Sequence, residues 1–175
     1  IMMTCSGLIL TTYSTWANPA WMKDVRFDFS NIAIGVLLAA ALWVVFWLGE
    51  FFSTLLFDFA RPQVDMIYGM KEGENPWVLT ALMLFIIGPA EEIFWRGYLQ
   101  KNFTERWNPD VAFAVTTLMY SLVHISKFNF MLIMAAMVAG IVWGLAYRFF
   151  PEKLGAIIIS HALWDCAVFI WFPIM

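Results

Sequence analysis

Three hydrophobic segments of this sequence carry ionisable side chains whose types and spacing suit acid–base chemistry. They read GPAEEIFWRGYLQ, MYSLVHIS and IIISHALWD, in chain order. The ionisable residues in them are Glu91, Glu92, Arg96, His124, His161 and Asp165. A charged group in an apolar environment is costly and is rarely kept without a task. The three segments therefore indicate a working site made of two glutamates, an arginine and both histidines of the chain.

The first segment predicts two different roles for its adjacent glutamates. Glu92 and Arg96 are spaced i, i+4 on a helix and can pair along one face, whereas Glu91 points about 100° away around the helix axis. Gly88 and Pro89 should disturb the helix just before the pair. If a helical segment begins there, both carboxylates lie in its first turn, where free amide groups and the helix dipole favour negative charge. We expect Glu92 to be structural and Glu91 to be free.

The histidine segments are expected to meet this pair. His161 and Asp165 are again spaced i, i+4 and share one helix face, while His124 stands alone on its own helix. With a rise of about 1.5 Å per residue, Glu91 and these three residues lie roughly 10 to 20 Å from the helix ends on one side of the bundle. The charges of the loops assign that side to the cytoplasm. A helix tilt of about 20° makes these depths overlap. A single buried polar pocket nearer the cytoplasmic face follows.

Composition indicates the elements that must hold this pocket. The chain has 175 residues, of which 62% are hydrophobic and 13% charged, against about 25% charged residues in soluble proteins. The charges fall in short intervals between long apolar runs, as in a multi-pass integral membrane protein. The net charge of -3 argues against a nucleic-acid partner. Two cysteines, Cys5 and Cys166, cannot form a dense disulfide framework.

The apolar runs predict about six membrane spans in one all-α domain covering residues 1–175. The longest extramembrane loop is expected at residues 58–76. Because the sequence begins IMMTCSG with a short apolar run, we expect further N-terminal sequence before it. The expected spans are a partial one at residues 1–16 and full ones at residues 32–57, 77–100, 111–126, 130–147 and 155–172.

The distribution of lysine and arginine predicts the orientation. The loops after the first, third and fifth spans hold six such residues and the other two loops hold three. By the positive-inside rule, the richer set faces the cytoplasm. The richer set is Lys23, Arg26, Lys101, Arg106, Arg148 and Lys153, and the poorer set is Arg61, Lys71 and Lys127.

In their order, the three segments resemble the CAAX protease and bacteriocin-processing family of intramembrane proteins. That family's pattern is Glu-Glu-x-x-x-Arg, then Phe-x-x-x-His, then His-x-x-x-Asn or Asp. The resemblance implies an all-helical peptidase that hydrolyses a lipidated or membrane-anchored protein. By position it implies that Glu91 is the general base on a water, helped by His124, and that His161 and residue 165 stabilise the oxyanion. Glu92 and Arg96 would order the site.

Two positions depart from the prenyl-protein proteases of that family. Tyr120 replaces the usual phenylalanine and adds a hydroxyl that needs a partner. Asp165 replaces asparagine, and an ionised aspartate would repel an oxyanion. It is therefore protonated, or orients His161, or helps to bind a metal. In the metal alternative, zinc is held by Glu91, His124 and His161, with or without Asp165, and activates a bound water. Spacing does not choose between the two mechanisms.

Other interpretations of these residues are open at the sequence level. The glutamate pair with Arg96 could be a structural ion pair, and His161 with Asp165 a clamp between helices. Ser121 with His124 and Cys166 with His161 are minor candidates for a nucleophile and base. A non-catalytic immunity or scaffold protein, binding a partner through the polar pocket, is the alternative function. A proton-relaying transporter is less favoured because no inverted repeat appears. Glu50 and Trp95 stay outside the catalytic set.

Overall fold

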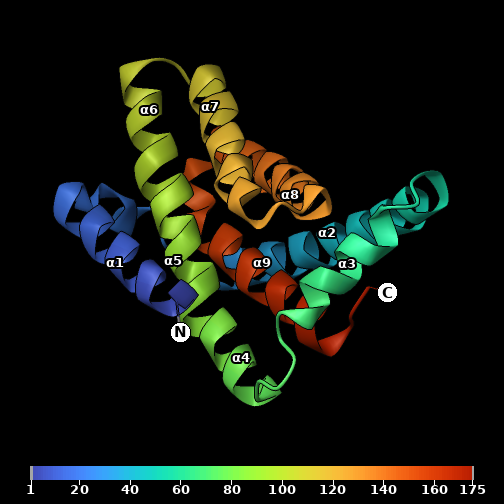
Figure 1. Cartoon of the computed structure of the whole chain (residues 1–175). Helices are drawn as coiled ribbons and strands as arrows, with labels where there is room; N and C mark the ends of the chain where they lie inside the picture. Colours follow the sequence, from blue (N-terminus) through green and yellow to red (C-terminus); the bar gives the residue numbers. More distant parts are fainter. Residues whose placement is uncertain (1, 175) are drawn as a thin grey trace.

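The computed structural model describes residues 2–174, and this part of the chain folds into helices without a β-strand (Figure 1). The all-α prediction is therefore confirmed. The α-helices are α1 (Met2–Ala17), α2 (Phe29–Leu56), α3 (Ala60–Gly69), α4 (Pro76–Leu82), α5 (Gly88–Glu92), α6 (Lys101–Arg106), α7 (Pro109–Leu122), α8 (Phe130–Phe149) and α9 (Leu154–Cys166). The 3-10 and π-helical segments are η1 (Pro19–Lys23), η2 (Met83–Ile87), η3 (Ile93–Gln100), η4 (Val123–Lys127), η5 (Pro151–Lys153) and η6 (Ala167–Trp171).

Four helices of the described residues are long and apolar enough to cross a membrane, at Phe29–Leu56, Pro76–Arg106, Phe130–Phe149 and Pro151–Trp171. The predicted first and fourth spans correspond to α1 and α7. At 16 and 14 residues, these two helices are shorter than the four membrane-length helices. The predicted loop at 58–76 contains a helix, α3, which the sequence did not predict. Its polar residues suggested a loop, yet they line a short helix with one buried face that includes Ala60 and Val64.

The segment with the glutamate pair is part of one continuous helical rod, Pro76–Arg106, of 31 residues. Gly88 and Pro89 do not break this rod. Instead the helix changes its winding on both sides of α5, where η2 and η3 are π-helical. A π turn is wider than an α turn and often marks a functional site. The disturbance expected at Pro89 is thus a change from α-helical to π-helical winding on both sides of α5.

The rod crosses α9 at the centre of the bundle, as the green and red helices show in Figure 1. A Cβ atom added at Gly88 would lie 2.8 Å from the Cα atom of Ala162, so only glycine permits this approach. Residue 91 is the midpoint of the rod and residue 161 is the midpoint of the span Pro151–Trp171. The crossing therefore brings the centres of two spans together.

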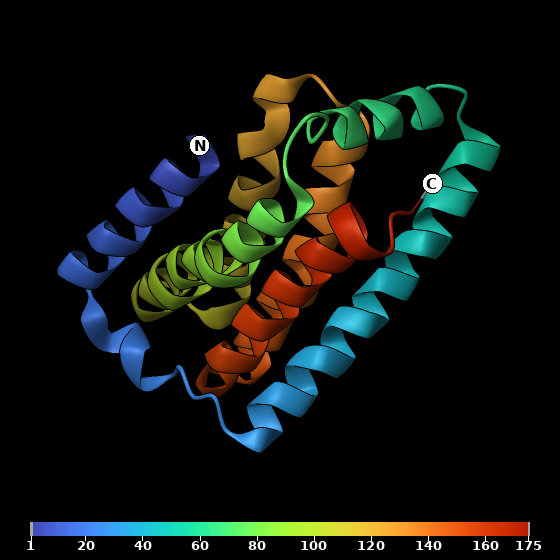
Figure 2. The ribbon, with the colours of Figure 1, turned by 90° about the horizontal axis from the view of Figure 1, so that it is seen from below.

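α9 is the central helix and α2 is a peripheral one. Two thirds of the most apolar stretch of the α9 span is buried (67%), against 17% for α2. Figure 2 shows α1 and α2 at opposite edges of the bundle, with the rod and α9 between them. α2 packs closely on α9 at Gly35, where a Cβ atom would lie 2.8 Å from the carbonyl oxygen of Ala156. Its other side carries exposed apolar residues, as expected of a surface that faces lipid.

A second close approach joins α8 to α7. Cβ atoms added at Gly140 and Gly144 would lie 3.1 Å from Tyr120 and 2.9 Å from Phe113. Small residues four apart allow two membrane helices to come this near, and their backbone carbonyl oxygens become accessible to polar side chains. The carbonyl oxygens of these two glycines accept hydrogen bonds from Arg96, Thr117 and Gln100.

The interhelical loops gather at two ends of the bundle, in the alternation that the spans predict. At one end, Lys101 pairs with Asp24 and Lys153 contacts Ser30. At the other end, Asn129 donates to the carbonyl oxygen of Gln63 at 2.8 Å. At the first end Asp28 caps α2 by accepting from the backbone and side chain of Asn31, and these hydrogen bonds hold the pKa of Asp28 below its usual range.

Candidate active site

Glu92, Arg96 and His161 form a buried cluster where the rod crosses α9. Arg96 Nη1 lies 2.7 Å from Glu92 Oε1, and both side chains are fully buried. The ion pair expected from their spacing is therefore present. His161 Nδ1 lies 2.6 Å from the same oxygen. Because a carboxylate only accepts hydrogen bonds, His161 Nδ1 must carry a proton here. Glu92 thus orients the imidazole of His161 as well as pairing with Arg96.

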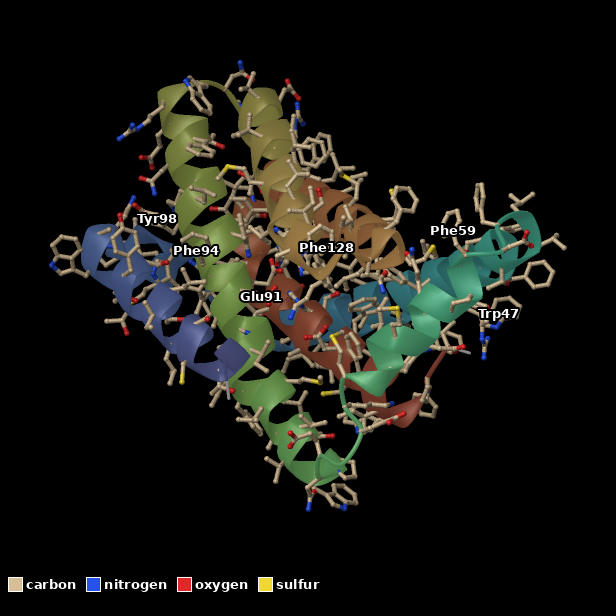
Figure 3. All side chains as sticks on the ribbon, viewed as in Figure 1. Trp47, Phe59, Glu91, Phe94, Tyr98 and Phe128 are labelled. Carbon is tan, nitrogen blue, oxygen red and sulfur yellow. The ribbon has the colours of Figure 1, made fainter. Side chains whose placement is uncertain are left out.

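Glu91 has different surroundings from its neighbour. Its side chain is 23% exposed, whereas that of Glu92 is 0% exposed. Its Oε2 atom accepts a hydrogen bond from the Tyr120 hydroxyl at 3.2 Å and lies 4.0 Å from His161 Nε2. Figure 3 shows Glu91 near the centre of the molecule. Glu91 is the acidic group of the cluster with the most access for a water molecule.

Asp165 approaches the same imidazole from its own helix. Asp165 Oδ2 lies 3.5 Å from His161 Nε2, so this nitrogen faces two carboxylates, Glu91 and Asp165. The nearer partner of the ring is Glu92, at 2.6 Å on the other nitrogen. The orienting role considered for Asp165 is thus already performed by Glu92.

An aromatic platform fixes the plane of the His161 ring. The indole of Trp143 stacks on it, with ring centroids 3.9 Å apart and planes inclined by 19°. Trp143 is fully buried and its Nε1 atom donates to the Ser160 hydroxyl at 3.1 Å. The imidazole is therefore held both in its plane and in its direction. A stacked indole also attracts a cationic ring.

His124 joins the cluster through Tyr120. It lies in η4, where its Nδ1 atom is 3.0 Å from the Tyr120 carbonyl oxygen. A carbonyl oxygen is an acceptor, so Nδ1 carries the proton and Nε2 is the acceptor in the neutral ring. Its ring meets the Tyr120 ring edge-on, at 5.8 Å between centroids. Within residues 2–174, the described contacts connect His124 to Glu91 through Tyr120 and give no direct bond between them.

The arrangement does not form a ready zinc site. In the described part of the chain, no group of three or more His, Cys, Asp and Glu side chains could hold a metal ion. Nδ1 of His161 is bonded to Glu92 and Nδ1 of His124 to a backbone carbonyl, so Nε2 is the nitrogen of each ring that could bind a metal.

The minor nucleophile candidates have other partners. The buried Ser121 hydroxyl donates to a carbonyl oxygen of its own helix at 3.0 Å. The Cys166 thiol faces the carbonyl oxygen of Thr80 at 3.7 Å. Glu50 pairs with Arg61, which extends from α3, at 3.2 Å. These contacts favour structural roles for all three residues.

Three contacts of the cluster were not expected from the sequence. The bond between Glu92 and His161 joins residues 69 positions apart, and no spacing rule links them. The stacking of Trp143 on His161 had no sequence signal either, because tryptophans are common in this chain. The Tyr120 bond to Glu91 did have one. A hydroxyl in an apolar span needs a partner, and its partner is the free glutamate.

The segment that contains this cluster matches a protein-family model. A protein-family model described as type II CAAX prenyl endopeptidase Rce1-like matches residues 73–167, which is more than half of the chain. No curated protein and no solved structure gives a match. The matched segment includes every ionisable residue of the candidate site, namely Glu91, Glu92, Arg96, His124, His161 and Asp165.

Proposed function

Because the chain belongs to the Rce1-like family of type II CAAX prenyl endopeptidases, we propose that it is an intramembrane endopeptidase that cleaves a peptide bond in a lipidated or membrane-anchored protein. One observation carries the proposal. Glu91 is partly exposed, while the neighbouring Glu92, Arg96 and His161 form a rigid buried cluster behind it. A general base needs access to water and a fixed geometry, and Glu91 has both.

In the proposed reaction, Glu91 takes a proton from a water molecule as the water oxygen attacks the scissile carbonyl carbon. The resulting tetrahedral intermediate carries a negative oxygen. His161, 4.0 Å from Glu91, donates to this oxygen through Nε2 when it carries a second proton. Glu91 then passes its proton to the leaving nitrogen, and the peptide bond breaks. His124 assists from the Tyr120 side.

The substrate is proposed from the family description together with the location of the site. The glutamate pair and His161 lie at the midpoints of membrane-length helices, so the scissile bond must come to membrane depth. A lipid anchor close to the cleavage site would bring it there. A peptide that ends in a prenylated Cys-a-a-X sequence is therefore the first substrate to test. We place the opening of the site on the cytoplasmic side, at the end of the bundle richer in lysine and arginine.

The test uses the purified protein in nanodiscs with a farnesylated Cys-a-a-X peptide and the same peptide without the lipid. Glu91→Gln should lower kcat by roughly 100-fold or more, because it removes the general base. Glu50→Gln is the matched control, since Glu50 also lies in a membrane span but pairs with Arg61. It should retain activity. Turnover by Glu91→Gln at the wild-type rate, with an unchanged melting temperature, would overturn the assignment.

A chelator separates the glutamate and zinc mechanisms. The proposed mechanism predicts full activity after treatment with a strong chelator and dialysis. Loss of activity that zinc restores would establish the metal alternative. The scaffold alternative predicts that no peptide is cleaved and that Glu91→Gln leaves the cellular phenotype unchanged.

A further inference from the structure

The hydroxyl of Tyr120 lies at the centre of the candidate site and, among residues 2–174, has one hydrogen-bond partner. Tyr120 comes from α7 and is 5% exposed. Its hydroxyl donates to Glu91 Oε2 at 3.2 Å, across 29 positions of sequence. This is the one hydrogen bond of the Glu91 side chain among residues 2–174. The Tyr120 hydroxyl is thus the group that restrains the partly exposed carboxylate of Glu91.

The tyrosine ring itself is held on several sides. Trp95 meets it edge-on, with centroids 5.4 Å apart. The guanidinium carbon of Arg96 lies 4.7 Å from the ring centroid, in cation–π contact. On the α8 side, Gly140 leaves room for the ring, because a Cβ atom there would come within 3.1 Å of it. The hydroxyl therefore occupies a defined point.

The hydrogen bond from Tyr120 gives the two carboxylate oxygens of Glu91 different surroundings. Oε2 faces both the tyrosine hydroxyl and His161 Nε2, at 3.2 and 4.0 Å. With Oε2 engaged, Oε1 is the oxygen available to a water molecule. Without the bond, an exposed glutamate would populate several rotamers, and only some of them would direct an oxygen at the substrate.

We propose that Tyr120 is a positioning residue, whose hydroxyl fixes the Glu91 carboxylate so that one oxygen is presented to the attacking water. The catalytic part of this inference rests on the proposed peptidase function. The structural part, a hydrogen bond that restrains Glu91, is independent of activity. The two parts are tested separately.

The kinetic test compares Tyr120→Phe with the wild type. Phenylalanine keeps the ring and its contacts with Trp95 and Arg96, so the melting temperature should be unchanged. Loss of a hydrogen bond to a charged group should lower kcat by roughly 10-fold while KM stays within twofold. Tyr147→Phe is the matched control, because Tyr147 is also buried, at 4% exposed, near the far end of α8. It should leave kcat unchanged.

A double variant connects the effect to Glu91. In the Glu91→Gln background, Tyr120→Phe should cause no further loss, because the oxygen that it positions is no longer a base. Equal losses in both backgrounds would overturn the inference. So would a rise in KM at constant kcat, which would indicate a substrate-binding role instead.

An infrared measurement gives a readout that needs no turnover. The carboxyl band of Glu91 is the one that Glu91→Gln removes from the spectrum. Loss of the hydrogen bond should move this band in Tyr120→Phe and leave it in place in Tyr147→Phe. An unmoved band would overturn the inference even if activity fell. A shifted band in a protein that cleaves no peptide would overturn the proposed function while establishing the bond.

Discussion

Glu91 and Glu92 are neighbours in the chain with opposite surroundings. Glu92 shares one oxygen between Arg96 and His161 in a fully buried position. Glu91 is partly exposed and bonded to Tyr120. Removing a buried partner leaves an uncompensated charge, whereas removing a partly exposed one leaves a group that water can solvate. We therefore expect the loss of Glu92 to lower the stability of the protein, and the loss of Glu91 to lower turnover.

Glu92→Gln should destabilise the protein by about 3 kcal/mol, because the Arg96 guanidinium is left buried without a carboxylate. Glu91→Gln should change stability by less than about 1 kcal/mol. The measurement is reversible unfolding in mixed detergent, followed by circular dichroism, with both variants purified in parallel. If the two variants had the same free energy of unfolding, the buried ion pair of Glu92 would contribute no more to stability than the partly exposed Glu91 does.

Asp165→Asn tests whether the aspartate has a role of its own. Glu92 already directs the His161 ring, and Asp165 lies farther away, at 3.5 Å from the other nitrogen. The variant should therefore keep kcat within about fivefold of the wild type, since an amide can still accept from or donate to the imidazole. His161→Asn, which removes the ring itself, is the control that should inactivate. Complete loss in Asp165→Asn would give the carboxylate a direct catalytic part.

At the scale of elements, the site exists because two helices cross at glycine and alanine. α5 and α9 approach closely at Gly88, one turn before Glu92, and at Ala162, next to His161. The sequence indicated a disturbance at Gly88 and Pro89 but not its purpose. A glycine that permits a close approach cannot be distinguished from one that bends a helix until the partner helix is known. The π-helical segments η2 and η3 lie directly before and after α5.

Gly88→Ala should therefore separate α5 from α9. The added methyl would lie 2.8 Å from the Ala162 backbone, so the helices must move apart. Overpacking of this kind costs about 1 to 3 kcal/mol, and the movement should lengthen the Glu92–His161 bond and lower kcat. Gly49→Ala in α2 is the matched control, because a Cβ atom there meets nothing within 4 Å. Unchanged stability and activity in Gly88→Ala would show that the crossing is not tightly constrained.

At the scale of the whole molecule, the predictable part was the class and the alternation of the loops. Long apolar runs and confined charges indicate membrane helices in any arrangement. Which helices become neighbours is not encoded in the same pattern, because an apolar side chain can face lipid as well as another helix. The sequence pattern therefore does not predict which helix is central. It also does not predict the central position of α9, the peripheral position of α2 or the Glu92–His161 contact.

Orientation in the membrane is a property of the whole chain, and the charged residues of the loops predict it. The end that contains Lys101 and Lys153 has the larger share of basic residues and should face the cytoplasm. Two exposed glutamates mark the opposite ends, Glu152 after α8 and Glu72 after α3. In a Cys5→Ser background, Glu72→Cys should react with an impermeant maleimide in intact cells. Glu152→Cys should react only after permeabilisation.

The same labelling decides where a substrate can enter. Cys166 is buried and should contribute little signal, so the Cys5→Ser protein without an added cysteine gives the background. If Glu152→Cys reacted from outside and Glu72→Cys did not, the bundle would be inverted, and the proposed cytoplasmic opening would be wrong. The Glu91 site would keep its geometry in that case, because it lies at the midpoint of the rod. Its substrate would then have to be an anchored protein on the other side of the membrane.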